Sequence, residues 1–261
     1  MVLIEPLQDL DGFLLDLDGV VYLKYRPIPA ALRFIREARR SGRRVIFLTN
    51  NSSRTRQEYS TMLTSMGIEC APQDVVTSAY ATATLLAARR PGASVFCVGE
   101  DGLVRELQAQ GLRVTDDPPV NFVVAGIDFH FTYEKLAKAA TMIMEGARFV
   151  STNRDATFPT EEGPRPGAGS IVSAIQTASG RRPLNVGKPN RRIFEAARRI
   201  LGLDASRIGV VGDRMETDIL GGIRAGMKTI LVLTGVTDSE TLRSSKIRPD
   251  LVLKTLDEAI E

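Results

Sequence analysis

The sequence predicts an α/β protein with a doubly wound parallel sheet and a second, inserted α/β domain. Apolar strand-like segments alternate with amphipathic helical segments along the chain, and this alternation is typical of sheets covered by helices on both faces. The middle of the chain has an alternation of its own, followed by a loop rich in glycine and proline at 154–169. A length of 261 residues allows one large domain or two modest ones.

The first part of the chain is predicted to fold as strand, helix, strand and helix. The expected elements are a strand at 12–18, a helix at 28–42, a strand at 43–50 and a helix at 54–66. The apolar run GFLLDLD suits a strand that is buried on both faces. A strand–helix–strand unit of this length implies a parallel pair with a right-handed crossover.

The last part of the chain repeats this pattern. The expected elements are strands at 182–186, 207–213 and 228–235, helices at 190–202 and 215–226, and the closing segments 249–253 and 255–261. We therefore expect residues 1–81 and 182–261 to form a Rossmann-like core.

The middle of the chain, 82–181, is predicted to be an inserted α/β domain. The expected elements are strands at 94–100, 121–127 and 147–153 and helices at 102–111 and 132–146. One continuous sheet would also explain the pattern. The number of strands and the long loop that follows favour the insert, because structureless loops of this length are uncommon inside one compact domain.

Composition excludes several classes of function. The 34 basic and 31 acidic residues give a net charge of +3, and the basic pairs are spread along the chain rather than gathered as in nucleic-acid binders. We see neither an apolar run long enough to span a bilayer nor a secretory signal. Cys70 and Cys97 suggest neither a disulfide framework nor a metal site. We expect a cytoplasmic protein that binds neither nucleic acid nor a membrane.

The chain has a single histidine, His130, so a zinc site with several histidines is excluded. Acid–base chemistry near neutral pH is then expected to fall to carboxylates or lysine.

Polar side chains follow the ends of the predicted core strands. They are Asp16 and Asp18, then Thr49, Asn50 and Asn51, then Lys188, and finally Asp213 with Asp218 five residues later. The carboxyl ends of parallel strands meet at one edge of the sheet, where such folds bind ligands. We therefore expect these side chains to converge.

This set suits phosphoryl transfer. Clustered carboxylates are the hard oxygen donors that Mg²⁺ prefers, and a lysine with hydroxyl and amide groups can bind phosphoryl oxygens. A carboxylate can also be the nucleophile and form an aspartyl-phosphate. A calcium-binding loop starting at Asp16 is excluded because Val20 and Val21 occupy positions that need a donor and a glycine. A P-loop ending at Lys188 is excluded because Pro189 follows it.

At these residues the chain resembles the haloacid dehalogenase-like hydrolase superfamily. The motifs DLDG, TNN, GKP and GDRMETD occur in order. The last of them, together with the segment from Thr152 to Gly169, resembles the NagD-like, or 4-nitrophenylphosphatase-like, branch. That branch has an α/β cap between its second and third motifs, which supports the insert.

The resemblance implies a role for each residue. Asp16 would be the nucleophile and a Mg²⁺ ligand, and Asp18 the general acid and base, with its backbone carbonyl on Mg²⁺. Asp213 would be the second carboxylate ligand, and Asp218 would orient a metal-bound water or Lys188. Lys188 would neutralise Asp16 and the phosphate. The phosphoryl oxygens would be held by Thr49 and Asn50, with Asn51 close by.

Some of these residues have structural alternatives. Asp218 could be an ordinary first-turn carboxylate that stabilises a helix dipole. The Thr49–Asn51 segment could instead cap the next helix. The loop 153–170 could be a plain connector, or it could bring Asp155 over the active site to contact the leaving group.

The expected activity is Mg²⁺-dependent hydrolysis of a small phosphorylated metabolite. Asp18 argues against dehalogenation, because the superfamily's dehalogenases lack this second aspartate. A nearby dianionic phosphate would favour the protonated form of Asp18, which a general acid needs. A phosphotransferase or mutase on the same scaffold and a non-catalytic sensor of a phosphorylated metabolite remain alternatives. The resemblance also allows a homodimer formed through the cap. The motifs do not identify the substrate, because the shape of the cap determines which substrates fit and the motifs do not report that shape.

Overall fold

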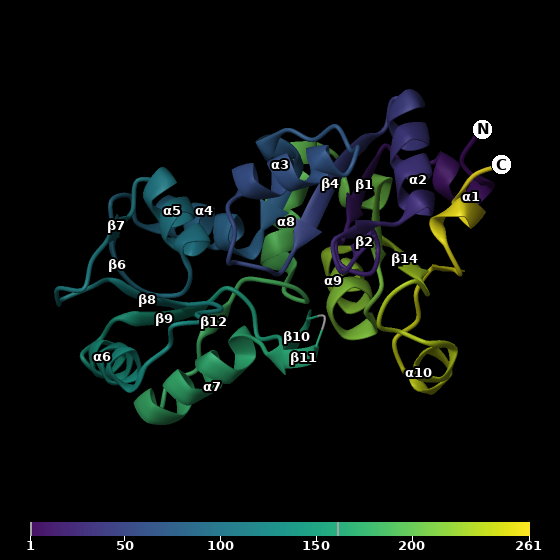
Figure 1. The fold of residues 1–261 in the computed structure, drawn as a ribbon. Helices are drawn as coiled ribbons and strands as arrows, with labels where there is room; N and C mark the ends of the chain where they lie inside the picture. Colours follow the sequence, from purple (N-terminus) through teal and green to yellow (C-terminus); the bar gives the residue numbers. More distant parts are fainter. Residues whose placement is uncertain (1, 161) are drawn as a thin grey trace. The chain divides into compact units, whose positions relative to one another are not determined.

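The computed structural model describes residues 2–160 and 162–261, which divide into two units (Figure 1). Unit 1 comprises Met1–Thr49, Tyr59–Val76 and Lys188–Glu261, and unit 2 comprises Asn50–Glu58 and Thr77–Gly187. The boundaries expected from the sequence, 81/82 and 181/182, lie a few residues inside those of unit 2. The domain boundaries stay a prediction.

Unit 1 is built on a six-stranded sheet with the strand order β15-β14-β13-β1-β4-β5. In chain order its strands are β1 (Gly12–Leu15), β4 (Arg44–Thr49), β5 (Val75–Thr77), β13 (Ile208–Gly212), β14 (Lys228–Val232) and β15 (Leu251–Leu253). The central strand β1 pairs in parallel with both β13 and β4, and β14 continues the parallel pairing to β15. The doubly wound α/β core predicted from the sequence is therefore confirmed.

Helices cover both faces of this sheet. The helices of unit 1 are α1 (Glu5–Gln8), α2 (Pro29–Arg40), α8 (Arg191–Leu201), α9 (Leu220–Ala225) and α10 (Ser239–Ser244), and α3 (Arg56–Ser65) begins in unit 2 and continues into unit 1. On one face, Phe34 of α2 packs edge-on against Phe13 of β1, with ring centroids 5.0 Å apart. On the other face, α8 packs against β4 and Gly222 of α9 lies against Val210. Every residue of β1 is buried, as the apolar run predicted.

Helix ends follow local sequence signals. Pro29 begins α2, where a missing N–H costs nothing. The Asn190 side chain accepts a hydrogen bond from the backbone N–H of Arg192 at the start of α8, and Gly202 ends that helix in a left-handed conformation with φ 65°.

A two-stranded hairpin, β2 (Tyr22–Leu23) with β3 (Arg26–Pro27), follows β1 and was not predicted. Both residues of its turn have positive φ, 47° at Lys24 and 61° at Tyr25. This is the backbone of a type I′ turn, but Asn-Gly, the usual signal for that turn, is absent.

Unit 2 has a parallel sheet of its own with the order β12-β9-β8-β6-β7. Its elements are α4 (Ser78–Arg89), β6 (Ser94–Val98), α5 (Asp101–Ala109), β7 (Arg113–Val114), β8 (Phe122–Ala125), α6 (Tyr133–Met144), β9 (Arg148–Ser151), β10 (Thr157–Thr160), β11 (Gly163–Pro166), α7 (Ala168–Ser179) and β12 (Leu184–Asn185). Helices α6 and α7 pack together on one side of this sheet, and α4 and α5 lie on the other (Figure 1).

Two local predictions were wrong. The strand expected at 182–186 in the core sheet is β12 of the second sheet. The loop expected at 153–170 contains the antiparallel hairpin β10–β11 and the start of α7; Glu161 in this loop lies outside the described residues. The helix expected at 215–226 is confirmed, although its first turn is a π-helix, η3 (Met215–Ile219), that continues as α9. Short 3₁₀ turns complete the fold: η1 (Pro72–Asp74), η2 (Ala205–Arg207) and η4 (Leu256–Ala259).

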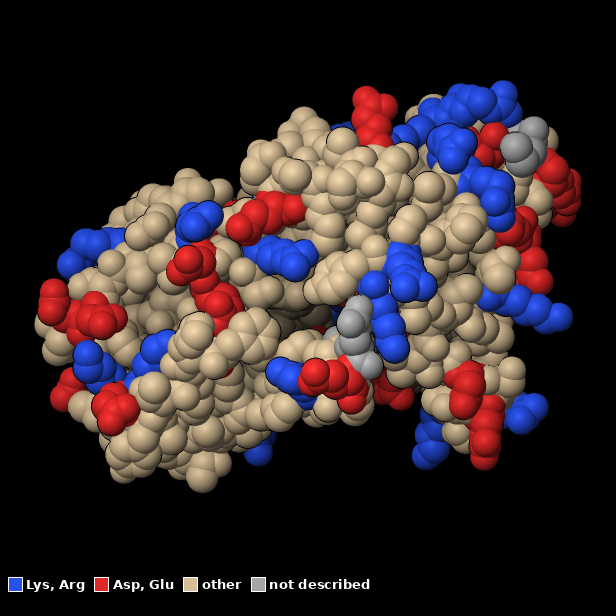
Figure 2. All heavy atoms as spheres, in the orientation of Figure 1, with Lys and Arg blue, Asp and Glu red and all other residues tan. Residues whose placement is uncertain are grey.

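On the face shown in Figure 2, basic and acidic side chains are interspersed, in keeping with the spread of basic pairs along the sequence. Among the described residues, the helices are all too short or too polar to cross a membrane.

Candidate active site

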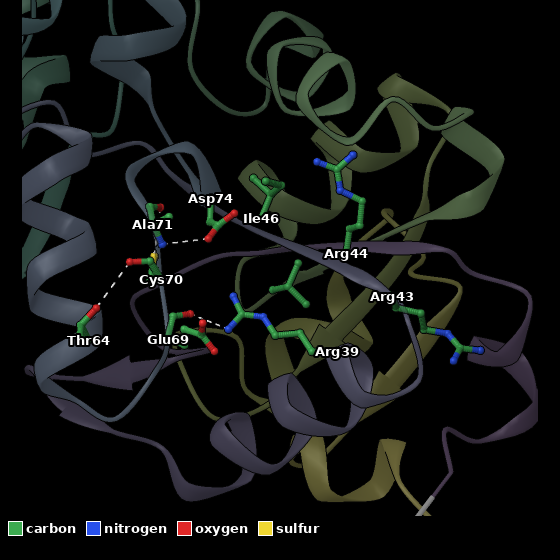
Figure 3. A pocket seen from close by; sticks show the side chains of 10 residues that line it. Arg39, Arg43, Arg44, Ile46, Thr64, Glu69, Cys70, Ala71 and Asp74 are labelled. Atoms are coloured by element: carbon green, nitrogen blue, oxygen red, sulfur yellow. Dashed lines mark hydrogen bonds between the residues drawn. The ribbon is translucent and has the colours of Figure 1, made fainter.

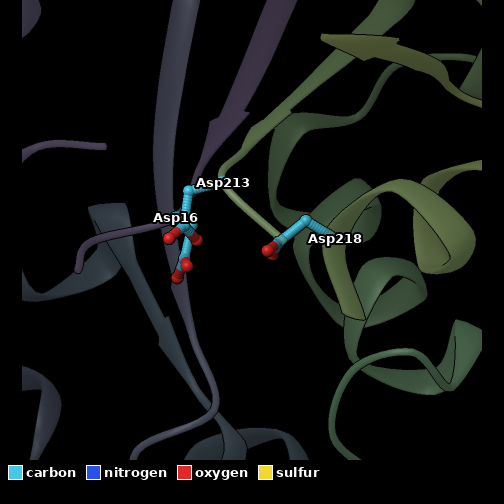
Figure 4. A group of neighbouring side chains, drawn as sticks. All are labelled: Asp16, Asp213 and Asp218. Carbon is cyan, nitrogen blue, oxygen red and sulfur yellow. The ribbon is translucent and has the colours of Figure 1, made fainter. Parts of the chain in front are cut away.

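Three carboxylates meet at the carboxyl edge of the core sheet (Figure 4). Asp16 directly follows β1, Asp213 directly follows β13, and Asp218 lies in η3. One oxygen from each lies within 4.8 Å of the others. The parallel pairing of β1 with β13 explains the first two positions, because neighbouring parallel strands end side by side.

Lys188 joins this cluster from the segment before α8. Its ammonium nitrogen lies 2.7 Å from Oδ1 of Asp16 and 2.7 Å from Oδ1 of Asp218. It also donates a hydrogen bond of 3.2 Å to the carbonyl of Leu48 in β4. The Lys188 side chain is 3% exposed, so its charge is balanced by these carboxylates rather than by water.

Asp218 has both carboxylate oxygens occupied. Oδ1 accepts from Lys188, and Oδ2 accepts from the backbone N–H of Arg214 and the hydroxyl of Thr217. Gly212 makes this position accessible, because a Cβ there would lie 2.1 Å from the Cβ of Asp218. The arrangement suits a residue that positions Lys188.

Asp213 differs, because one of its oxygens has no hydrogen-bond partner among the described residues. Oδ2 accepts a 2.7 Å hydrogen bond from the backbone N–H of Val236. Oδ1 is buried and, within the described part of the chain, makes no hydrogen bond. A buried polar atom without a partner is costly unless a ligand satisfies it.

The charges of the cluster are unbalanced. Burial raises the pKa of Asp213 to about 6, and the charge of Asp218 adds to this rise. Burial also raises the pKa of Asp16 well above its ordinary value, and Lys188 opposes that rise. Burial lowers the pKa of Lys188, but Asp16 and Asp218 outweigh it and raise the pKa above its ordinary value. Three ionised carboxylates around one ammonium would carry a net negative charge, which a bound divalent cation would balance.

The residues present fit Mg²⁺. The donors are carboxylate oxygens, which are the hard ligands that this ion takes. The unpartnered Oδ1 of Asp213 is available as a ligand. Asp18, expected to bind the ion through its backbone carbonyl, contributes no carboxylate to the cluster found among the described residues.

Asp18 is half-buried and contacts Tyr22 of the unpredicted hairpin. The Tyr22 hydroxyl donates a hydrogen bond of 3.3 Å to Oδ2 of Asp18, and Tyr22 itself is 1% exposed. Sequence reasoning missed Tyr22, because it comes after the DLDG motif and resembles an ordinary apolar core residue.

Thr49 ends β4 and is buried. Of the other predicted substrate-binding residues, Lys188 belongs to unit 1, whereas Asn50, Asn51 and Asp155 belong to unit 2. The amide nitrogen of Asn50 lies 3.1 Å from both carboxylate oxygens of Asp155. The Asn51 side chain accepts hydrogen bonds from the backbone N–H and hydroxyl of Ser53.

The segment after β14 is a second feature that sequence reasoning missed. Val236 there contacts Asp213, and the Thr234 hydroxyl donates to the carbonyl of Gly19. A signal was present: the sequence predicts a core strand at 228–235, and the residues at the end of a parallel strand belong to the ligand-binding edge of the sheet.

A separate pocket of about 600 Å³ lies at the opposite end of β4 (Figure 3). Its lining residues are Arg39, Arg43, Arg44, Val45, Ile46, Thr64, Glu69, Cys70, Ala71 and Asp74. Each arginine donates to a backbone carbonyl: Arg39 to Glu69, Arg43 to Leu10 and Arg44 to Leu201.

Burial raises the pKa of both cysteine thiols, Cys70 and Cys97, to about 12, which suits unreactive core residues.

Comparisons with known proteins agree with these motifs. A family model described as haloacid dehalogenase-like hydrolase matches residues 13–113, and a second, HAD-hydrolase-like, matches residues 185–259. The chain is 40% identical to an acid sugar phosphatase of Staphylococcus saprophyticus, over 96% of each chain.

Solved structures give the same result. A 4-nitrophenylphosphatase from Thermotoga maritima has a TM-score of 0.93 and 38% identity, over 97% of each chain. A glycerol phosphate phosphatase from Mycobacterium tuberculosis, solved in complex with magnesium, has a TM-score of 0.90 and 37% identity, over 97% of this chain and 77% of that one. The chain belongs to the haloacid dehalogenase-like hydrolase superfamily, in its NagD-like, 4-nitrophenylphosphatase-like branch.

Proposed function

We propose that this protein is a Mg²⁺-dependent phosphatase that hydrolyses small phosphomonoesters through an aspartyl-phosphate on Asp16. That it is a phosphatase acting on small phosphorylated substrates follows from its family and its phosphatase relatives. The metal dependence and the covalent step are our proposal. The observation that carries them is the buried Asp16–Lys188–Asp213–Asp218 cluster, in which Oδ1 of Asp213 makes no hydrogen bond to the residues that the structure describes.

Asp16 is the nucleophile in this proposal. Lys188 holds its carboxylate at 2.7 Å and favours its ionised form. A carboxylate oxygen of Asp16 attacks the phosphorus, a bond from that oxygen to phosphorus forms, and the ester P–O bond breaks with its electron pair leaving on the alcohol oxygen.

Asp18 moves the protons. Its protonated carboxyl gives a proton to the leaving alcohol oxygen, and the resulting carboxylate then takes a proton from a water molecule. That water attacks the phosphorus of the aspartyl-phosphate, so phosphate is released and Asp16 is regenerated. The Tyr22 hydroxyl holds the Asp18 side chain between these two steps.

Asp16, Asp213 and the backbone carbonyl of Asp18 would hold Mg²⁺. The bound ion would supply positive charge to the phosphoryl oxygens. Thr49, Asn50 and Asn51 keep the role of binding those oxygens, and Asp155 that of contacting the leaving group, as the family resemblance implies. The cytoplasmic location and a homodimer also stay predictions.

Phosphate release from 4-nitrophenyl phosphate tests the proposal. We expect activity with Mg²⁺, none with EDTA and none in Asp16→Asn, whereas the exposed-site control Asp101→Asn keeps full activity. Activity that survives Asp16→Asn would contradict the covalent assignment. Glycerol and sugar acceptors added to the assay separate hydrolysis from phosphotransfer, because a transferase would give less free phosphate when they are present.

A further inference from the structure

We propose that the segment Thr234–Thr237, which follows β14, positions the Asp213 carboxylate so that its Oδ1 faces the metal site. The inference rests on the proposed function in one respect, that Asp213 is a Mg²⁺ ligand. The inference adds to the metal site a segment that contributes no carboxylate and acts on Asp213 through its backbone groups.

The backbone N–H of Val236 makes the direct contact. It donates a 2.7 Å hydrogen bond to Oδ2 of Asp213. The Val236 side chain is exposed, with 61% of the residue accessible, whereas Asp213 is 2% exposed. The N–H rather than the side chain therefore does the positioning. With Oδ2 bound in this way, Oδ1 is the oxygen that remains without a partner in the described structure.

Gly235 makes the close approach of this backbone to Asp213 achievable. A Cβ at Gly235 would lie 2.0 Å from Oδ2 and 2.6 Å from Cγ of Asp213. Gly235 does not have the left-handed φ that would itself demand glycine. The requirement is one of space, and any side chain there would push the carboxylate out of place.

A second glycine, Gly19, also lies close to the Asp213 carboxylate. A Cβ at Gly19 would lie 2.4 Å from Oδ2 of Asp213 and 3.0 Å from the Cα of Gly235. The Thr234 hydroxyl donates to the carbonyl of Gly19, so the same segment also contacts the turn that follows Asp16 and Asp18. The backbone N–H of Thr237 closes the segment with a 3.1 Å bond to the Asp213 carbonyl.

In other metal sites, groups that hydrogen-bond to a ligand side chain also fix its orientation. Groups that orient a ligand typically contribute about 10–100-fold to metal affinity. We therefore expect the segment to act mainly on Mg²⁺ binding, and on turnover only through it.

The test measures Mg²⁺ binding directly, by isothermal titration calorimetry, in the full-length protein. The variants are Gly235→Ala, which adds the obstructing Cβ, and Val236→Pro, which removes the N–H. Val236→Ala is the conservative partner, since it keeps the N–H. We expect Gly235→Ala and Val236→Pro to weaken Mg²⁺ binding about 10–100-fold, and Val236→Ala to stay within a factor of about two of the wild type.

Thermal unfolding without metal checks that each variant is folded. If Val236→Pro does not fold, Gly235→Ala carries the test alone, because alanine suits the backbone at this exposed position. Phosphate release as a function of Mg²⁺ concentration should show the same weakening, with the rate recovering at high Mg²⁺.

Wild-type affinity in Gly235→Ala would overturn the inference and leave the proposed function intact. Equal loss in Val236→Ala and Val236→Pro would also overturn it, because the side chain would then be responsible. A wild-type protein that binds no Mg²⁺ would overturn the metal site and this inference together.

Discussion

The Lys188 ammonium lies 2.7 Å from Oδ1 of Asp218, and the two side chains are only 3% and 1% exposed. Asp218 thereby holds Lys188 in a place where it also reaches Asp16. Both oxygens of Asp218 accept hydrogen bonds, from Lys188, Arg214 and Thr217, which suits a residue that positions Lys188.

Lys188→Met should abolish the Mg²⁺-dependent activity and, in the absence of metal, lower the free energy of unfolding. Breaking a buried ion pair by deleting one partner typically costs about 3–5 kcal/mol, and here two carboxylates lose their partner. Urea denaturation without Mg²⁺ measures the loss, with the exposed-site variant Lys254→Met as the control. Equal stability of the two variants would contradict the structural part assigned to Lys188.

Mg²⁺ should stabilise the folded protein. A ligand that binds only the folded state adds about 2.7 kcal/mol at a concentration of 100 times its Kd. The thermal midpoint of the wild type should therefore rise with Mg²⁺ concentration. The midpoint of Asp213→Asn should not rise, since that variant lacks one ligand charge. A rise of the same size in both proteins would remove Asp213 from the metal site.

Phe34→Ala should destabilise unit 1. Phe34 is fully buried and packs against Phe13 across α2 and β1. Deleting a buried phenylalanine ring typically costs about 3–5 kcal/mol, whereas exposed-site substitutions such as Ile223→Ala cost about 0.5 kcal/mol or less. Chemical denaturation monitored by circular dichroism compares the two.

Asp250 should make stability depend on pH. Burial raises the pKa of Asp250, but the hydrogen bonds from the Thr229 backbone N–H and hydroxyl and the charge of Lys228 outweigh it, so the pKa lies below its ordinary value. A carboxyl with a lowered pKa contributes stability above its unfolded value of about 3.9 and loses it as the pH falls through the folded value. The stability difference between wild type and Asp250→Asn should therefore be present at neutral pH and disappear in acid.

Denaturation at a series of pH values from neutral to acid measures this difference. Asp204→Asn is the control, since the Asp204 side chain makes no capping hydrogen bond. A difference between Asp250→Asn and the wild type that stays constant with pH would contradict the linkage.

The strand ends were predictable because their positions follow from local pattern. The apolar run before Asp16 and the run before Asp213 define two buried strands, and parallel pairing places both ends at one edge. Lys188 was expected there for a wrong reason. The strand before it, β12, belongs to the second sheet, and Lys188 reaches Asp16 from the segment that leads into α8.

Other features had no local signal. The hairpin after Asp18 turns at Lys24-Tyr25, two residues that rarely adopt positive φ, so its turn could not be recognised. Periodicity predicted a helix at 215–226 but not that its first turn, Met215–Ile219, is π-helical with Asp218 packed close to Gly212.

The sequence by itself determined the α/β class, the order of the motifs and the types of side chain at the strand ends, because hydrophobic periodicity and chemical identity are local properties. Only the tertiary structure decided how those side chains are held. The Asn50–Asp155 contact joins residues 105 positions apart, and the Val236–Asp213 contact is made by a backbone group with no sequence identity of its own. Such contacts depend on how segments that are distant in the sequence pack together, and no single local segment of the sequence determines that packing.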